Sequence, residues 1–400
     1  MTKIEELLAE LCPNGVVWKE LGEVCVVNKG KQLNKTLLTD DGRYPAYNGG
    51  KTYSGRTSDY NVEENTIIIS QGGASAGFVN FVTTKFWANA HCYYLLPDLK
   101  LVDNRYLYHF LKMKQSYLMD FQHGAGIPAL KSDKITKMVL PLPPLEIQQE
   151  IVALLDKFTE YVTELTAELT LRQKQYNYFR DYLLNFDSDS SGGANNKVYQ
   201  VEWKTLGEIL IKGRGTKVTA GQMKELHKDG APIRIFAGGK TFADVDYGDI
   251  PEKDVHHEEA IIVKSRGIID FEYYTKPFSF KNEFWSYSSD SDDVNLRYVY
   301  HYLNHNKSHF QHIAGNMQMP QISSNDTEKY KIPLPTKTVQ SRIVQVLDNF
   351  DTVCNDLNIG LPKEIELRQK QYEYFREKLL TFTAEGVYPG QWTVSGDRPT

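Results

Sequence analysis

Apolar residues recur at steps of three and four along two long stretches of the chain, a spacing that places side chains on one face of an α-helix. The first stretch carries Ile147, Ile151, Leu154, Phe158, Val162, Leu165, Leu169, Tyr176, Phe179, Leu183 and Phe186. The second stretch carries Val339, Ile343, Val346, Phe350, Val353, Leu357, Tyr372, Phe375, Leu379 and Phe382. Prolines precede the first stretch, and the fixed φ of proline suits a helix start. The pattern predicts long helices over residues 145–186 and 336–382.

A single helix over residues 147–186 would extend roughly 60 Å, at about 1.5 Å per residue. A helix of that length cannot bury its whole apolar stripe on one small domain, so it needs a second long helix as a partner. We therefore predict that the two stretches pack together as an intramolecular antiparallel coiled coil. The alternative, in which each helix packs only on its own domain, stays open from the sequence.

The second stretch differs from the first because it contains Gly360-Leu361-Pro362 within the expected helix. Proline removes a helix hydrogen bond, and glycine weakens a helical turn. We predict a break or kink near Gly360 and an uninterrupted first helix.

The chain contains a long internal repeat. Residues Arg172–Phe186 (RQKQYNYFRDYLLNF) return as Arg368–Phe382 (RQKQYEYFREKLLTF), with eleven of fifteen positions identical and an offset of 196. At an offset of 192, the matching residues of the first copy are Arg105, Tyr106, Tyr108, His109, Leu111, Gln148, Ile151, Leu155, Asp156 and Phe158. A period this long indicates two copies of a whole domain with its attached helix. The offset changes within the front of each copy, and variable loops on a constant frame are where recognition usually lies.

The fronts of the two copies contain short β-rich runs broken by glycines, such as residues 66–70, 77–82 and 260–263. Each front also has one expected helix, over residues 104–117 and 296–310. The predicted class is α+β, with two tandem globular α/β domains joined by two long helices. The predicted boundaries are 1–143 for the first domain, 144–186 for the first long helix, 187–198 for a linker, 199–334 for the second domain, 335–383 for the second long helix and 384–400 for a tail.

Charge and composition limit the possible functions. A net charge of −5 and a pI near 6.1 argue against a broad basic surface that holds nucleic acid unaided, so phosphate contacts would be local or supplied by partners. No apolar run reaches the roughly 18 residues of a membrane span, and the N-terminus lacks signal-peptide character, so we expect a cytoplasmic protein without membrane contact. Cys12, Cys25, Cys92 and Cys354 lack CxxC spacing, which favours reduced structural thiols over a metal site.

Catalytic motifs are missing from the sequence. Gly50-Lys51-Thr52 and Gly239-Lys240-Thr241 resemble part of a phosphate loop, but the required earlier glycine is replaced by Pro45 and Arg234. Lys51 and Lys240 are therefore either phosphate-contacting or simply solvated. The sequence also lacks a dinucleotide fingerprint, a nucleophile elbow, a zinc-protease motif and an amino-methyltransferase motif. We predict a non-catalytic chain.

Glycine-rich loops follow the strand-like runs of both fronts. Gly72–Gly77 in the first front and Ser265-Arg266-Gly267 in the second occupy equivalent places. These glycines either form a hairpin or let the backbone approach a nucleic-acid groove. The pair His91-Cys92 is better explained as a core or hydrogen-bonded histidine beside a buried thiol than as a catalytic pair.

Several segments together resemble the specificity subunit of type I restriction-modification systems. They are TKIEELLAELCPNGVVWKELGEV, SQGGASAGFV, ANAHCYYL, PLPPLEIQQEIVALLDKF and RQKQYNYFRDYLL, and the resemblance covers residues 1 to about 383. The resemblance implies two target-recognition domains that each read half of a bipartite sequence in double-stranded DNA, while the long helices set the spacing and dock two modification (methyltransferase) subunits. It further implies that restriction or motor subunits join the complex, and that S-adenosylmethionine and ATP with Mg²⁺ bind to partner subunits rather than to this chain.

Candidate DNA-contacting side chains are basic, amide or hydroxyl groups in the two fronts: Lys51, Arg56, Gln71, Ser75, Arg214, Lys240, Arg266 and Gln318. The apolar stripes listed above are the candidate spacer and partner-docking residues. A different class of function, an interaction scaffold that binds partner helices without reading sequence, is the main alternative. A nucleotide hydrolase that uses Lys51 or Lys240 is a weaker one.

Overall fold

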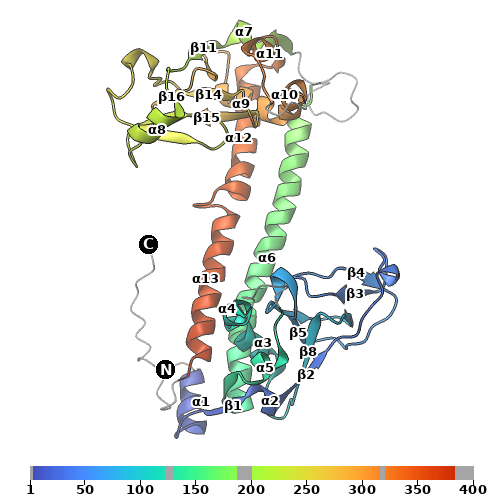
Figure 1. Cartoon of the computed structure of the whole chain (residues 1–400). Helices are drawn as coiled ribbons and strands as arrows, with labels where there is room; N and C mark the ends of the chain where they lie inside the picture. Colours follow the sequence, from blue (N-terminus) through green and yellow to red (C-terminus); the bar gives the residue numbers. More distant parts are fainter. Residues whose placement is uncertain (1–2, 122–128, 187–200, 316–319, 383–400) are drawn as a thin grey trace. The chain divides into compact units, whose positions relative to one another are not determined.

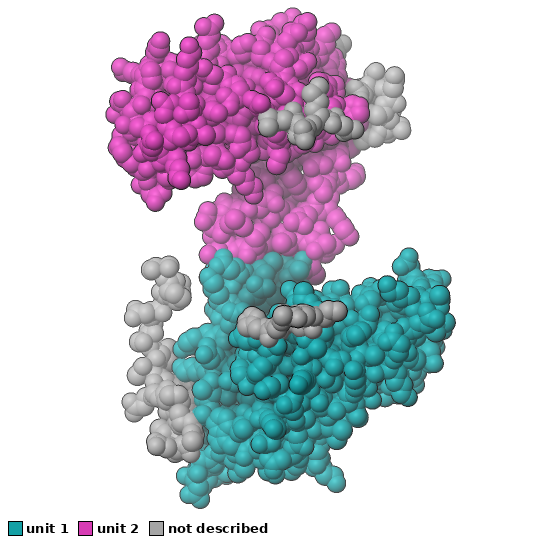
Figure 2. Space-filling model, in the orientation of Figure 1, with its two compact units in different colours: residues 1–166, 364–400 teal, residues 167–363 magenta. Residues whose placement is uncertain are grey.

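In the computed structural model, the described residues are 3–121, 129–186, 201–315 and 320–382. The chain divides into two compact units (Figure 2): the first unit comprises residues 1–166 and 364–400, and the second comprises residues 167–363. Each unit contains one globular domain and parts of both predicted long helices. The predicted linker at 187–198 and the tail at 384–400 lie outside the described residues.

In the domain of the first unit, the described strands form three small sheets, and Figure 1 labels at least one strand of each. A four-stranded antiparallel sheet has the order β2 (Cys25–Lys29), β8 (Cys92–Pro97), β5 (Thr66–Ser70), β6 (Val79–Val82). A three-stranded sheet has the order β4 (Gly55–Thr57), β3 (Tyr44–Tyr47), β7 (Trp87–Ala88), with β3 and β7 parallel. A two-stranded sheet pairs β1 (Val17–Glu20) with β9 (Val139–Leu142).

The domain of the second unit repeats this topology strand for strand. Its four-stranded sheet has the order β11 (Ile211–Arg214), β17 (Trp285–Ser288), β14 (Ala260–Lys264), β15 (Asp270–Tyr274). Its three-stranded sheet has the order β13 (Phe242–Val245), β12 (Ile233–Phe236), β16 (Phe278–Phe280), again with one parallel pair. Its two-stranded sheet pairs β10 (Glu202–Thr205) with β18 (Lys331–Leu334). The repeat seen in the sequence is therefore a repeat of structure.

One helix pair in each domain corrects a sequence prediction. The expected helix over 104–117 is two helices, α3 (Asn104–Met113) and α4 (Gln115–Asp120), and the one over 296–310 is α9 (Leu296–His305) followed by α10 (Lys307–Ile313). At the junctions, ψ is 8° at Lys114 and 16° at Asn306, outside the α-helical range. Neither junction carries a glycine or proline, so the sequence gives no local signal for the interruption.

The remaining short helices lie near the ends of strands. In the first unit they are α1 (Lys3–Leu11), α2 (Leu21–Val24), α5 (Ser132–Thr136), η1 (Lys35–Leu37) and η2 (Gly73–Ser75). In the second unit they are α7 (Leu206–Ile209), α8 (Ala220–Leu226), α11 (Ser324–Glu328) and η3 (Glu252–Asp254).

The first predicted long helix is α6 (Leu145–Leu183), an uninterrupted helix of 39 residues. The second is divided into α12 (Lys337–Asn355) and α13 (Leu361–Leu380). Between them, the side chain of Asp356 accepts hydrogen bonds from the backbone N–H groups of Asn358 and Ile359. A Cβ on Gly360 would lie 2.5 Å from the carbonyl oxygen of Thr352, so this turn requires glycine.

Two residues near the interruption have positions that differ from the prediction. Pro362 lies in the first turn of α13, where its missing N–H costs no helix bond, so it begins a helix rather than breaking one. Leu357 was expected in the apolar stripe but is 71 % exposed in the connection. Val346 on α12 is also partly exposed, at 37 %. The break near Gly360 is present, and it removes Leu357 from the packed face.

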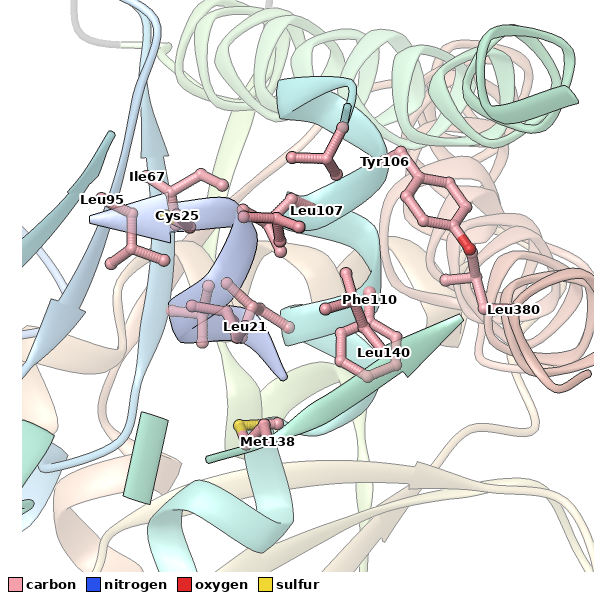
Figure 3. Packing of buried hydrophobic residues seen from close by; sticks show 14 of the residues in the cluster. Leu21, Cys25, Ile67, Leu95, Tyr106, Leu107, Phe110, Met138, Leu140 and Leu380 are labelled. Carbon is pink, nitrogen blue, oxygen red and sulfur yellow. The ribbon is translucent and has the colours of Figure 1, made fainter. Parts of the chain in front are cut away.

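Both long stretches contribute to the core of each unit. In the first unit, the core around β5 and α3 includes Ile147, Ile151 and Leu155 from the start of α6. It also includes Leu379 and Leu380 from the end of α13, and Leu380 appears among the labelled core residues of Figure 3. The first turns of α6 are thus part of a domain core, as the alternative interpretation of the stripe proposed.

The second unit is built the same way from the opposite ends of the helices. Its core contains Ile343 and Leu347 of α12, together with Leu184 and Phe186 just after α6. Leu184 and Phe186 match Leu380 and Phe382 of the repeat. The end of each long helical stretch therefore completes the core of the other copy's domain.

Beyond these cores, aromatic residues join the long helices to each other. In the first unit, Phe158 of α6 stacks on Phe375 of α13, with ring centroids 5.2 Å apart and planes 13° apart. In the second unit, Phe350 of α12 packs against Tyr176 and Phe179 of α6. Within each unit, residue numbers rise along α6 as they fall along its partner, so the pairing is antiparallel. The predicted coiled coil is confirmed in this form, alongside packing on the domains.

Candidate nucleic-acid interface and its attachment to the long helices

A polar cluster, here called the clamp, fastens α3 to α6 in the first unit. It consists of Arg105 and His109 on α3 and Asp156 on α6. Nε of Arg105 donates to both carboxylate oxygens of Asp156 at 3.1 Å, and a second guanidinium nitrogen also donates to this carboxylate. Nε2 of His109 lies 2.8 Å from Oδ1 of Asp156. The guanidinium of Arg105 also lies over the ring of Phe81, 4.5 Å from its centroid.

The second unit has the same clamp between α9 and α12, formed by Arg297, His301 and Asp348. Nε of Arg297 donates to Asp348 at 3.0 Å, and Nε2 of His301 lies 2.6 Å from the same carboxylate oxygen. The guanidinium of Arg297 lies over the ring of Tyr273, 4.7 Å from its centroid. All three residues match the first clamp at an offset of 192.

A buried glutamine makes a second attachment next to each clamp. The side-chain amide of Gln148 donates to the carbonyls of Leu101 and Pro143, and its oxygen accepts from the N–H of Asp103 at 2.7 Å. Gln340 makes the three equivalent bonds in the second unit, to Asp293, Pro335 and Asn295. Both glutamines are fully buried, and every polar atom of both amides is used. The bond pattern fixes the loop before α3 or α9 to the start of the long helix.

The charges of the clamp are set by burial and by its hydrogen bonds. Burial lowers the pKa of the His109 and His301 imidazoles, although each faces a carboxylate that acts in the opposite direction. Burial alone would raise the pKa of Asp156, but hydrogen bonds from His109 and Arg105 lower it to about 2. At neutral pH, each clamp is therefore an arginine–carboxylate pair with a neutral histidine on the same carboxylate.

The two clamps differ in two respects. Arg105 makes three hydrogen bonds to Asp156, whereas Arg297 makes one to Asp348. Nδ1 of His109 lies 2.9 Å from the hydroxyl of Tyr372 on α13. His109 on α3 therefore contacts both α6 and α13 in the first unit. The repeat places Tyr176 of α6 at the matching position in the second unit. Among the described residues, no hydrogen bond joins His301 to Tyr176, whose ring instead packs against Phe350.

Three of the predicted DNA-contacting residues lie near one another in the first unit. Ser70, which precedes Gln71, donates its hydroxyl to the carbonyl of Gly50, and Lys51 follows Gly50 in the adjacent loop. Gln71 donates its side-chain amide to the hydroxyl of Tyr93 at 3.0 Å, so this amide is partly committed inside the domain. Ser75 lies in η2, which continues the same loop.

The surroundings of Lys51 are locally basic. Its ammonium lies 5.7 Å from the ring centroid of Phe78, and the ammonium of Lys112 lies over the same ring at 4.3 Å. Burial lowers the pKa of Lys112 to about 8, and the charges of Arg376 and Lys51 act in the same direction. A local excess of positive charge therefore exists on an acidic chain. Sequence analysis did not select Lys112, although its spacing from Arg105 places it on the same helix.

Arg56 lies apart from these residues, on β4 of the three-stranded sheet. It lines an open concavity of about 630 Å³ together with four tyrosines, and further lining residues are Arg43, Pro45, Glu64, Thr84 and Lys85. Figure 1 shows α3 beside α6, with β3 and β4 farther out in the domain. The first unit thus separates its predicted contacts into two groups, one on the loops and one on this sheet.

The predicted contacts of the second unit are spread over three elements. Arg214 is exposed on β11, and Lys240 is exposed in the turn between β12 and β13. Arg266 is exposed in the loop after β14, where its backbone forms an isolated β-bridge with Gln321. The equivalent bridge in the first unit joins Gly72 to Ala129. Gln318 lies outside the described residues, and the base-reading role of all these side chains stays a prediction.

One glycine of the Gly72–Gly77 loop has a packing role. Gly77 has a φ of 88°, and a Cβ there would lie 2.5 Å from the backbone carbon of Leu118 in α4. This glycine is therefore required by the contact between the loop and α4. Gly77 supports neither the simple hairpin alternative nor a direct approach to a nucleic-acid groove.

The thiol beside His91 is a structural group. Cys92 is buried, its Sγ donates to the carbonyl of Tyr47 at 3.3 Å, and it accepts from the N–H of Gly49 at 3.1 Å. Burial raises the pKa of this thiol to about 11, so it is protonated at neutral pH. Within the described residues, no group of three or more metal-ligating side chains is present, and no helix there is long and apolar enough to cross a bilayer.

Comparison with known proteins now gives the class. The family of the type I restriction modification DNA specificity domain matches residues 13–172 and again residues 200–367, once for each copy of the repeat. Together the two matches cover most of the chain. The chain belongs to this family.

Individual relatives agree over nearly the full length. The specificity subunit of the type I restriction enzyme EcoR124I/EcoR124II of Escherichia coli is 32 % identical over 416 residues, covering 96 % of this chain and 97 % of the relative. The crystal structure of a type I restriction-modification S subunit from M. genitalium has a TM-score of 0.68 at 20 % identity, covering 92 % of this chain and 97 % of the other. A chain solved in work on complex assembly and conformational transition of the type I system has a TM-score of 0.55 at 17 % identity, covering 92 % and 98 %. These two likenesses show that the fold is shared.

Proposed function

We propose that this chain is the sequence-specific DNA-recognition subunit of a type I restriction-modification complex. The observation that best supports this proposal is that two copies of one domain are attached to the long helices by matching residues, while their sheets and loops carry different side chains. Membership of the specificity-domain family and similarity to the E. coli specificity subunit support the proposal. Each domain reads one half of a bipartite target.

The long helices set the number of unread base pairs between the two half-sites. The clamp and the buried glutamine fix α3 to α6 and α9 to α12, so a change in helix length would be passed to the attached domain. A loosely attached domain could move relative to its helix, and the number of unread base pairs would then no longer be fixed.

The same helices dock two modification subunits and, with them, the restriction or motor subunits. Apolar and aromatic side chains remain exposed on α6 and α13, among them Leu171 at 57 %, Tyr178 at 63 % and Tyr374 at 58 %. Exposed aromatic side chains of this kind are favoured at protein interfaces. The chain itself is non-catalytic, and S-adenosylmethionine and ATP with Mg²⁺ bind to the partner subunits.

The domain assignment is tested by exchanging residues 15–143 for the same segment of another specificity subunit. Methylome sequencing of cells that express the hybrid with its modification subunits should show one altered half-site and one retained half-site. A hybrid that alters both half-sites, or neither, would contradict independent reading by the two domains.

The spacing role is tested by inserting or deleting whole helical turns in α6, between the two units' aromatic contacts. The expected result is a changed number of unread base pairs with both half-sequences unaltered. An unchanged gap would count against the spacer role. Gel-shift competition among random duplexes, with modification subunits present, separates this function from a scaffold, because a scaffold shows no sequence preference.

A further inference from the structure

We propose that the three-stranded sheet of the first unit carries a binding site for a backbone phosphate of duplex DNA, with Arg43 as its principal ligand. The site is the concavity lined by Arg43, Tyr44, Tyr53, Arg56, Tyr60 and Lys85. This inference rests on the proposed function and assigns one class of contact to one face of one domain. It does not assign base reading to this face.

Each cation of the concavity is placed over an aromatic ring. The guanidinium of Arg43 lies 5.3 Å from the ring centroid of Tyr44, and that of Arg56 lies 5.9 Å from the centroid of Tyr53. The ammonium of Lys85 lies 4.5 Å from the centroid of Tyr60. Cation–π contacts hold long basic side chains in defined positions, which lowers the entropy lost when an anion binds.

The rings are themselves braced by packing. Tyr44 and Tyr60 contact each other with centroids 5.0 Å apart. Tyr47 contacts Tyr53 edge-on and also contacts Phe86, which is fully buried in the small core beside this sheet. The cations therefore stand on a platform that is continuous with the interior of the domain.

The three cations differ in how many donors remain available. Arg56 donates to the carbonyls of Gly42 and Arg43, at 2.5 and 2.9 Å. Lys85 donates to the hydroxyl of Tyr60 and pairs with Glu63. The guanidinium of Arg43 is exposed and makes no hydrogen bond or ion pair with any part of the chain that the structure describes.

These commitments give the residues different roles. Arg56 holds the loop that bears Arg43, because its donors are directed to that loop's carbonyls. Arg43 keeps its full set of N–H donors for an external acceptor. A guanidinium with free paired donors matches the oxygens of a phosphate.

A stacked base is a poorer fit to this concavity than a phosphate. A cation covers one face of each of Tyr44, Tyr53 and Tyr60, which leaves less ring surface for a stacked base. The lining itself carries three cations, Arg43, Arg56 and Lys85, against one carboxylate, that of Glu64. Phosphate contacts of this kind fix register and add affinity without carrying sequence information.

The matching sheet of the second unit lacks this arrangement. The strand register places Arg56 opposite Pro45, and it places Asp244 opposite Arg234. The guanidinium of Arg234 is therefore neutralised by a two-bond pair with Asp244, at 2.7 and 3.0 Å. Lys228 beside it is paired with Asp246 and Asp249. Among the residues that the structure describes, the matching place in the second unit therefore offers no equivalent phosphate site.

The test uses the full chain assembled with its modification subunits and compares wild type with Arg43→Ala. Binding to a target duplex and to an unrelated duplex is measured at a series of salt concentrations. Loss of one phosphate contact should reduce the slope of log Kobs against log[salt] by about 0.9 and weaken binding to both duplexes by the same factor. Arg43→Lys should keep most of the slope, because it keeps the charge.

The matched control is Lys228→Ala, which removes an exposed, carboxylate-paired cation from the same region of the second unit and should leave the slope unchanged. An unchanged slope in Arg43→Ala would overturn the proposal. A selective loss of target over unrelated duplex would also overturn it, because it would make Arg43 a base reader. If the wild-type complex shows no preference for any duplex, the proposed function fails instead, and the salt slope still tests the phosphate contact.

Discussion

The same sheet position carries Arg56 in the first unit and Asp244 in the second, whereas the clamp position carries a carboxylate, Asp156 or Asp348, in both. These positions lie in matching elements of two domains with the same strand order. The clamp position has the same charge and the same types of partner in both copies, whereas the sheet position is positive in the first copy and negative in the second. The comparison shows that the attachment to the helices tolerates little change, while the three-stranded sheet is free to vary.

A duplicated chain therefore contains its own reference. Residues that keep both type and contacts in the two copies, such as Gln148 and Gln340, mark the frame. Residues that keep their place in the topology but not their chemistry mark surfaces that have acquired different tasks. This division is the one expected if each domain reads its own half-site, as proposed above.

The strongest test of the shared attachment is the replacement of Gln148 or Gln340 by leucine. Each change leaves two carbonyls and one N–H buried without partners, at about 1–3 kcal/mol for each group, so we expect the free energy of unfolding of the affected unit to fall by roughly 3–9 kcal/mol. Segment-resolved hydrogen exchange should show faster exchange around α3 for Gln148→Leu and around α9 for Gln340→Leu.

The neighbouring Gln149 is exposed and serves as the matched control, because Gln149→Leu removes no internal bond. Equal acceleration in both units by either single change would show that the two attachments do not act separately.

Acidification should weaken both clamps in parallel, with a smaller effect. Burial holds the pKa of His109 and His301 below that of the unfolded chain, so the unfolded state takes up protons first as the pH falls. This contribution to stability is complete above the unfolded pKa of about 6.5 and declines below it. The pKa of Asp156, lowered to about 2, adds a further loss only between about pH 4 and pH 2.

The measurement is the free energy of unfolding between pH 7 and pH 5, for wild type and for a double variant with His109→Gln and His301→Gln. The variant should show a flatter pH dependence over this range. If wild type and variant have the same slope, the histidines do not govern it.

The smallest predicted effect concerns the tyrosine hydrogen bond, which only the first clamp has. Tyr372→Phe removes the hydroxyl that contacts His109 and should destabilise the first unit by about 1 kcal/mol, the usual net value of a hydrogen bond. Tyr176→Phe, at the matching position of the repeat, should have almost no effect. Chemical denaturation of the two variants side by side measures the difference, and an equal response would remove the asymmetry between the clamps.

Local sequence patterns were enough to predict the repeat, the uninterrupted α6 and the break before α13. They were not enough at Lys114 and Asn306, where helices end without a glycine or proline. The clamp was visible in the sequence as polar residues retained at one offset, Arg105, His109 and Asp156 among them. Sequence analysis did not predict that these residues contact one another, because a repeated polar residue does not show which group it binds in the folded chain.

The sequence by itself determined that this protein is a domain built twice with two long apolar stripes, because repetition and helical spacing are properties of residue order alone. Only the tertiary structure decided which part of a stripe enters a domain core and which part meets the other helix, since both environments select the same apolar residues. It also decided that Arg56 supports a loop while Arg43 remains available. Which acceptor a guanidinium N–H binds depends on distances in the folded chain, and these cannot be read from the order of the residues.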